Sequence, residues 1–117
     1  MRPTGPLRPA EVLIQELLAR PDVAEAPGDM MGERSFQVQG REFLHLHGSS
    51  TLHIHLSREE KAAAIAAGEA REHPYAPRSG MVELRLAAEE QLPAARRLVD
   101  LALARVAGLS ERWPATA

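Results

Sequence analysis

Residues 45–55 read His45-Leu46-His47-Gly48-Ser49-Ser50-Thr51-Leu52-His53-Ile54-His55 and hold four of the five histidines of the chain. On both sides of the Gly-Ser-Ser segment, histidines alternate with apolar residues, which is the two-residue period of a half-buried strand. Glycine and serine are typical of turns. The stretch therefore predicts a β-hairpin with histidines on one face and aliphatic side chains on the other.

The register of this hairpin decides whether the four imidazoles share a face. One face of an antiparallel sheet is commonly packed on the core, so Leu46 must lie on the same side as Leu52. That condition allows His47 to pair with His53, or His45 to pair with His53 in a tighter hairpin. Either register places all four imidazoles on one face, because a slip by one residue would mix the apolar and polar side chains.

The strand expected before the hairpin leaves two arrangements open. Residues 34–39 alternate, and Gln39-Gly40 is a plausible two-residue loop because glycine tolerates positive φ. With that loop, Phe36 would pair with Phe43, and both rings would lie on the histidine side. With a longer loop, Phe36 would move to the leucine face together with Val38, and the histidine face would be lined by Gln37 and Gln39.

The rest of the chain predicts three helices and a further strand. A first helix begins at Pro9, carries an apolar stripe and stops at Arg20, before Pro21. Ser57 and Glu60 match a capping box, which predicts a second helix from residue 58 to about 67. The remaining elements are a strand over 81–86 and a last helix that has Pro93 in its first turn and ends at Gly108.

Length and composition fit a single domain, because 117 residues with 44% hydrophobic content can form one ordinary core. We expect a flexible N-terminal arm over residues 1–8, the domain over 9–109 and a C-terminal tail over 110–117. The order helix, three strands, helix, strand, helix predicts an α+β fold. In this fold an antiparallel meander sheet has its helices packed on one face and the histidines on the other.

Composition also argues against several classes of protein. The absence of cysteine excludes disulfide-rich scaffolds, cysteine-ligated zinc and thiol nucleophiles. A net charge of −2 and an aromatic content of 3% disfavour a nucleic-acid partner. No apolar run has the length of a membrane span and the start lacks a signal peptide, so we expect a cytoplasmic protein that does not bind membranes.

Several short motifs along the chain match one known family. They are Asp22-Val23, Phe36-Gln37-Val38-Gln39-Gly40-Arg41-Glu42, His45-x-His47-Gly48, Leu52-His53-Ile54-His55-Leu56, Ala70-x-Glu72-His73-Pro74 and Ser79-Gly80-Met81-Val82. With these motifs the chain resembles the luciferase-domain family of small bacterial proteins, which is distantly similar to fungal luciferases. Those enzymes oxidise a pyrone-type luciferin with oxygen. Met81 stands where the family often has tryptophan and His53 where an acidic residue is frequent, so the resemblance implies the domain and not that substrate.

The histidine face first suggests a metal site, because imidazole is the commonest metal ligand. Facing Cβ atoms in a sheet lie roughly 5 Å apart, so three or four of these nitrogens would reach one ion. Such a set suits Zn, Ni or Cu, and three ligands would leave an open position. The predicted ligands are His45, His47, His53 and His55, and the shell could be completed by Glu42, His73 or Glu83.

The second hypothesis is a metal-free pocket for a small-molecule ligand. His45 and His47 would act as a general base or as hydrogen-bond donors, with His73 on the adjoining loop as the third catalytic candidate. The family resemblance favours this pocket and leaves the reaction unnamed. A third hypothesis is a non-catalytic interaction module, in which the histidine face forms a homodimer contact.

Other polar residues give weaker signals. Asp29, Glu33 and Glu42 have no spacing that marks a carboxylate pair. Serines at positions 49, 50 and 79 lie in expected turns, so we interpret them as turn-shaping residues and not as nucleophiles.

Overall fold

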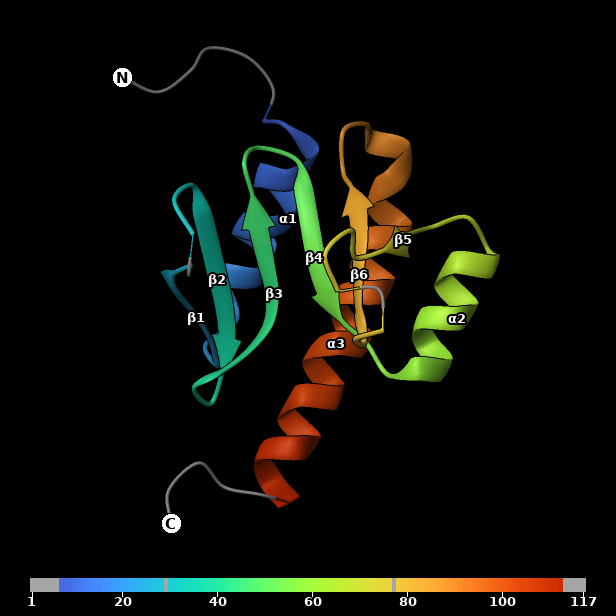
Figure 1. Ribbon diagram of the computed structural model, residues 1–117. Helices are drawn as coiled ribbons and strands as arrows, with labels where there is room; N and C mark the ends of the chain where they lie inside the picture. Colours follow the sequence, from blue (N-terminus) through green and yellow to red (C-terminus); the bar gives the residue numbers. More distant parts are fainter. Residues whose placement is uncertain (1–6, 29, 77, 113–117) are drawn as a thin grey trace.

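A computed structural model of the chain describes residues 7–28, 30–76 and 78–112. These residues form one six-stranded sheet, three α-helices and a short 3-10 helix (Figure 1). In chain order the elements are α1 (Pro9–Leu18), β1 (Val23–Pro27), β2 (Glu33–Val38), β3 (Arg41–His47), β4 (Thr51–His55), α2 (Arg58–Ala66), β5 (Arg71–Glu72), β6 (Met81–Arg85), η1 (Glu89–Gln91) and α3 (Leu92–Arg112). Most of the expected N-terminal arm, Asp29 and the end of the expected tail lie outside the described residues.

The sheet is antiparallel throughout, with the strand order β1-β2-β3-β4-β6-β5. The predicted α+β class and the meander β2-β3-β4 are confirmed. Two edge strands, β1 and β5, extend the sheet, and the two residues of β5 are too few for any periodicity. After α2 the chain returns to pair β6 with β4, which places Glu83 beside His53.

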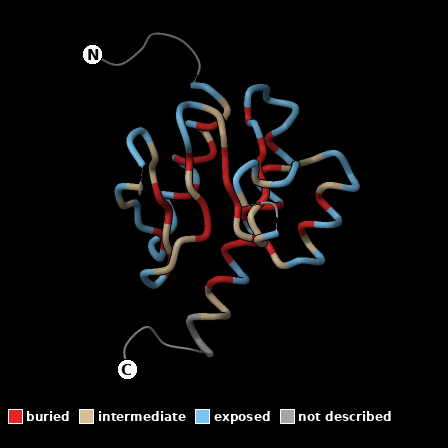
Figure 2. Tube along the Cα trace, viewed as in Figure 1, coloured by how far each residue is buried: buried red, intermediate tan, exposed pale blue. Residues whose placement is uncertain are grey.

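Helices α1 and α3 cover one face of the sheet, and no helix of the described residues lies on the opposite face, which is turned towards the viewer in Figure 1. Helix α2 lies beside the sheet edge near β5 and begins at the predicted capping box of Ser57 and Glu60. Figure 2 shows buried residues concentrated in the central strands and in the helices behind them. The covered face of β3, β4 and β6 consists of aliphatic side chains that are at most 4% exposed: Leu44, Leu46, Leu52, Ile54, Val82 and Leu84.

The turn between β2 and β3 has the two-residue loop of one expected arrangement, but it places Phe36 on the leucine face as in the other. Gln39 and Gly40 form the short loop, and both have positive φ, as in a type I′ turn. Phe36 nevertheless pairs with Leu44, because a β-bulge at the Phe36–Gln37 step leaves Phe43 as an extra residue. Both phenylalanines are fully buried in the core, so the expectation that they would line the histidine face is wrong.

The last helix is longer than the sequence predicted. It runs to Arg112 and passes Gly108, which does not take the left-handed conformation of a helix-ending glycine. Residues 110–112, assigned to the C-terminal tail, are therefore helical. A glycine inside a helix costs only about 1 kcal/mol relative to alanine. A single glycine therefore need not end the helix.

Gly80 fixes the start of β6 against the end of β4. A Cβ atom at this position would lie 2.3 Å from the carbonyl oxygen of Leu56, and the amide of Leu56 donates to the Gly80 carbonyl at 3.0 Å. Only glycine permits this approach. The close contact sets the register of β6 beside β4 and so determines what faces the histidines.

Candidate functional site

The histidine hairpin adopts the tighter of its two predicted registers. His45 lies opposite His53, and His47 lies opposite Thr51. Strand β6 then places Glu83 opposite His53 and Met81 opposite His55. All four imidazoles lie on the open face of the sheet, as predicted.

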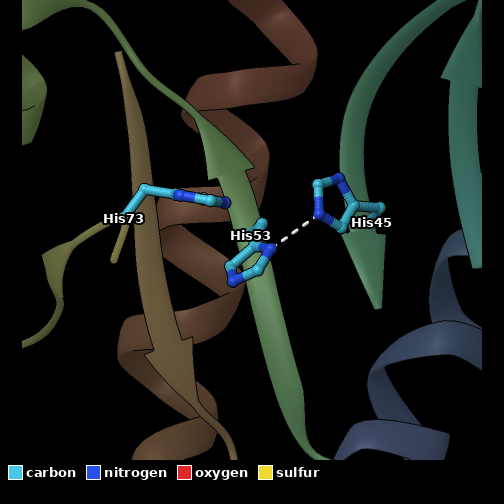
Figure 3. A group of neighbouring side chains, drawn as sticks. All are labelled: His45, His53 and His73. Atoms are coloured by element: carbon cyan, nitrogen blue, oxygen red, sulfur yellow. Dashed lines mark hydrogen bonds between the residues drawn. The ribbon is translucent and has the colours of Figure 1, made fainter. Parts of the chain in front are cut away.

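At the centre of this face, His45 and His53 are joined directly. His45 Nε2 lies 2.6 Å from His53 Nδ1, and the two rings meet edge to face (Figure 3). His53 Nε2 lies 2.9 Å from Glu83 Oε2, and a carboxylate can only accept, so this nitrogen carries a hydrogen. Neutral His53 therefore accepts at Nδ1 from the Nε2–H of His45, which fixes the tautomers of both rings.

Glu83 anchors this pair through its hydrogen bond with His53. Its side chain is 7% exposed, and its second oxygen accepts hydrogen bonds from the Arg71 guanidinium on β5. Burial raises the pKa of the Glu83 carboxyl, but the hydrogen bonds from His53 and Arg71 lower it more, so the pKa lies below its ordinary value. Glu83 is therefore ionised at neutral pH.

His73 approaches from the loop between β5 and β6. Its ring centroid lies 4.3 Å from that of His53, and Figure 3 shows the ring pointing towards His53. The backbone N–H of Tyr75 donates to His73 Nδ1 at 3.1 Å, so the neutral ring carries its hydrogen on Nε2. Burial lowers the pKa of His73, and the two neighbouring histidines lower it further. The neutral, Nε2-protonated form is thus favoured.

These three histidines line a hollow of about 500 Å³, which we call the histidine hollow. Glu33 contributes to it from β2: one carboxylate oxygen lies 3.4 Å from His45 Nε2, and the other accepts from the Met30 amide. The rim of the hollow includes the largely apolar side chains of Met30 and Tyr75, which are 65% and 92% exposed. The remaining lining residues are His47, Thr51, Arg71, Pro74 and Glu83.

A second cluster lies on the other side of the His45 ring. Glu42 Oε2 is 3.4 Å from His45 Nδ1 and 2.9 Å from His55 Nε2, while Ser35 Oγ donates to Glu42 Oε1 at 2.9 Å. Burial raises the pKa of Glu42, but the polar contacts with His45, His55 and Ser35 outweigh it and hold the pKa far below its ordinary value. We call Glu42, His45 and His55 the lateral cluster.

The predicted site residues therefore divide between two groups. The structure brings His45, His53 and His73 together around the hollow, and it places His55 in the lateral cluster with His45. His47 lines the rim of the hollow but does not converge with either set of histidines: its side chain is 49% exposed, and Nδ1 is 3.7 Å from Glu33 Oε2. The four hairpin histidines thus share a face but do not converge on one point.

Several polar partners escaped the sequence analysis. Glu33 has no spacing that marks a carboxylate pair, Glu42 was expected only as a residue that could complete a metal shell, and Ser35 and Arg71 gave no signal. Each reaches the site through strand pairing and not through its distance along the chain. Ser79, by contrast, shapes its turn as predicted, with Oγ donating to the Ala76 carbonyl and accepting from the Met81 amide.

Comparison with known proteins gives one result for this chain. The family model described as Luciferase domain matches residues 40–102, which include His45, His53, His73 and Glu83. Neither the curated proteins nor the solved structures contain a match. Within the described part of the chain, no helix has both the length and the apolar character needed to cross a membrane.

Proposed function

The chain belongs to the luciferase-domain family, and from this premise we propose that it binds a small molecule in the histidine hollow and exchanges a proton with it. The observation that carries the proposal is the His45–His53 pair at 2.6 Å, held between carboxylates. The proposal assigns proton exchange to this pair and hydrogen-bond donation to His73.

The surroundings of the pair favour uptake of a proton. Oxygens of Glu33 and Glu42 lie 3.4 Å from the two ring nitrogens of His45, and Glu83 lies 2.9 Å from His53. A proton taken from a ligand would go to His53 Nδ1, in place of the hydrogen bond from His45, and would give one imidazolium whose charge these carboxylates compensate. An imidazole whose acquired charge is compensated can act as a general base.

His73 supplies the complementary group. Because its Nδ1 accepts the Tyr75 amide, its Nε2–H is available to donate to a ligand. The basic His45–His53 pair and the neutral donor His73 lie on adjacent walls of the hollow. This arrangement suits a ligand with an acidic hydrogen beside an acceptor atom. The apolar rim of Met30 and Tyr75 would contact the rest of such a molecule.

A metal ion in the same hollow is the second candidate, because ligand atoms of His45, His53 and His73 lie within 4.8 Å of one another. Two observations disfavour it. The lone pair of His73 Nδ1 is already used, and the 2.6 Å between His45 and His53 is shorter than the roughly 3.4 Å expected between tetrahedral ligands with bonds of about 2.0–2.1 Å.

The test has two parts. Long-range ¹H–¹⁵N spectra should show His73 as the Nε2–H tautomer, unchanged when Zn²⁺ is added. A thermal-shift screen of weakly acidic fragments should give hits that stabilise the wild type and fail with His45→Gln and His73→Ala. Rim variant His47→Ala is the matched control and should keep most of the stabilisation. Zn²⁺ binding to His73, or hits that persist in both hollow variants, would overturn the proposal.

Three further expectations from the sequence remain predictions. They are a cytoplasmic location, the absence of a nucleic-acid partner and homodimer formation.

A further inference from the structure

We propose that the lateral cluster of Glu42, His45 and His55 binds a divalent first-row transition-metal ion, at a site separate from the histidine hollow. This proposal goes beyond the proposed function and does not depend on it. Two imidazoles and one carboxylate on adjacent strands form the donor set, which leaves positions open for water or another ligand.

The first argument is the spacing of the donor atoms. Two ligands with metal bonds of about 2.0–2.1 Å lie roughly 2.9 Å apart at a right angle and roughly 3.4 Å apart at the tetrahedral angle. Glu42 Oε2 is 2.9 Å from His55 Nε2 and 3.4 Å from His45 Nδ1. All three donor atoms lie within 4.8 Å of one another, so small side-chain rotations would direct them to one ion.

The second argument is that the donors are already oriented by outer partners, as metal ligands usually are. Ser35, which is 4% exposed, donates from Oγ to the Glu42 oxygen that faces away from the histidines. His45 donates from Nε2 to His53, which in turn donates to Glu83. With its Nε2 protonated, neutral His45 carries a lone pair on Nδ1, the nitrogen directed at the cluster.

Charge and access are also suitable. The Glu42 carboxyl is ionised at neutral pH, so the two imidazoles and the carboxylate would reduce the charge of the ion to +1. The side chains of Glu42 and His55 are each 29% exposed, which leaves a route for a hydrated ion. Neither of them lines the hollow, so the ion would not occupy the space of the small molecule.

A metal at this place would act on the hollow through His45. Coordination at Nδ1 excludes the alternative tautomer and keeps the hydrogen on Nε2, directed at His53. The ion would also increase the acidity of that hydrogen, since it withdraws electron density from the ring. The lateral cluster would thereby set the proton affinity of the His45–His53 pair.

The experiment titrates tag-free, chelator-treated protein with Zn²⁺ alone by calorimetry and with Co²⁺ by visible absorption. We expect one ion per chain. Glu42→Gln and His55→Ala should weaken Zn²⁺ binding by more than about 100-fold, because loss of a ligand exceeds the 10–100-fold effect of losing an outer partner. Ser35→Ala should fall within that smaller range. Co²⁺ should broaden NMR signals of His55 more strongly than those of His73.

His73→Ala is the matched control, because it removes a histidine of the hollow and leaves the lateral cluster complete. It should bind Zn²⁺ as the wild type does, and circular dichroism checks the fold of every variant. If His55→Ala does not fold, the Co²⁺ broadening pattern of the wild type decides. Zn²⁺ binding that survives Glu42→Gln and His55→Ala, or that is lost in His73→Ala, overturns the proposal. Fragment binding in the hollow is measured separately, so the two proposals can fail independently.

Discussion

The two faces of strands β3, β4 and β6 are built from alternating residues of the same segments, yet they differ in chemistry. The covered face carries Leu44, Leu52 and Val82, which are fully buried against α1 and α3. On the open face the intervening residues include His53 and Glu83, which are also almost fully buried, at 7% and 6% exposure. Similar burial is therefore reached with and without apolar side chains.

The difference lies in what burial requires. An aliphatic side chain gains free energy when it leaves water, whereas a polar group loses it unless a partner replaces the water. Each buried polar atom at the centre of the open face has such a partner: His53 has His45 and Glu83, and Glu83 has Arg71. The covered face stabilises the domain, and the open face keeps a preorganised polar network at little net gain in stability.

The largest expected effect is on the covered face. Leu52→Ala should lower the free energy of unfolding by about 2–5 kcal/mol, because it removes a fully buried side chain and leaves a cavity. Urea denaturation followed by circular dichroism measures this. A loss below 1 kcal/mol would mean that the core relaxes into the gap, and it would weaken the contrast between the faces.

An intermediate effect is expected at the centre of the open face. Glu83→Ala removes the acceptor of His53 Nε2–H and of Arg71, and leaving a buried donor unpaired costs about 1–3 kcal/mol. Glu83→Gln should cost less, because its amide oxygen still accepts. His47→Ala at the exposed rim is the control and should change stability by no more than about 0.5 kcal/mol. Equal effects for Glu83→Ala and His47→Ala would show that the network does not act on stability.

The smallest effect is the acid sensitivity of the lateral cluster. The pKa of Glu42 is lowered in the folded protein relative to 4.5, so the unfolded chain binds more protons as the pH falls below that value. The stabilisation from Glu42 is therefore present above about pH 4.5 and is lost on further acidification. In Glu42→Gln, the slope of unfolding free energy against pH below 4.5 should be shallower by up to about 1.4 kcal/mol per unit.

Denaturation curves of metal-free protein at a series of acidic pH values check this expectation. Glu25→Gln is the matched control, because the pKa of Glu25 is also lowered, by a hydrogen bond from Arg34, but in an exposed ion pair. A surface pair contributes little to stability, so the Glu25 variant should change the slope less. A larger change for Glu25 than for Glu42 would contradict the assignment of the acid sensitivity to the open face.

Much of the fold could be predicted because local rules act on short segments. The capping box at Ser57 and Glu60 starts α2 at the expected residue, and the alternation in 45–55 gives the hairpin and its shared histidine face. Both signals depend on neighbours within a few positions. The α+β class follows from the order of such segments.

The errors have physical causes that no short window reveals. The bulge beside Phe43 depends on how both phenylalanines fit beneath the helices, and it reverses the face expected for a two-residue loop. Helix α3 passes Gly108 because a glycine inside a helix costs only about 1 kcal/mol relative to alanine and need not end it. Strand β5 is only two residues long and forms because β6 offers a free edge.

The sequence by itself determined that the histidines lie together on one face, since a two-residue period and a buried apolar face allow no other arrangement. Only the tertiary structure decided which of them meet. Pairing of β6 with β4 brings Glu83 to His53, pairing of β2 with β3 brings Ser35 to Glu42, and the β5–β6 loop adds His73. These contacts join residues from separate segments, and their geometry depends on backbone approaches such as that at Gly80, which are fixed only when the whole sheet is assembled.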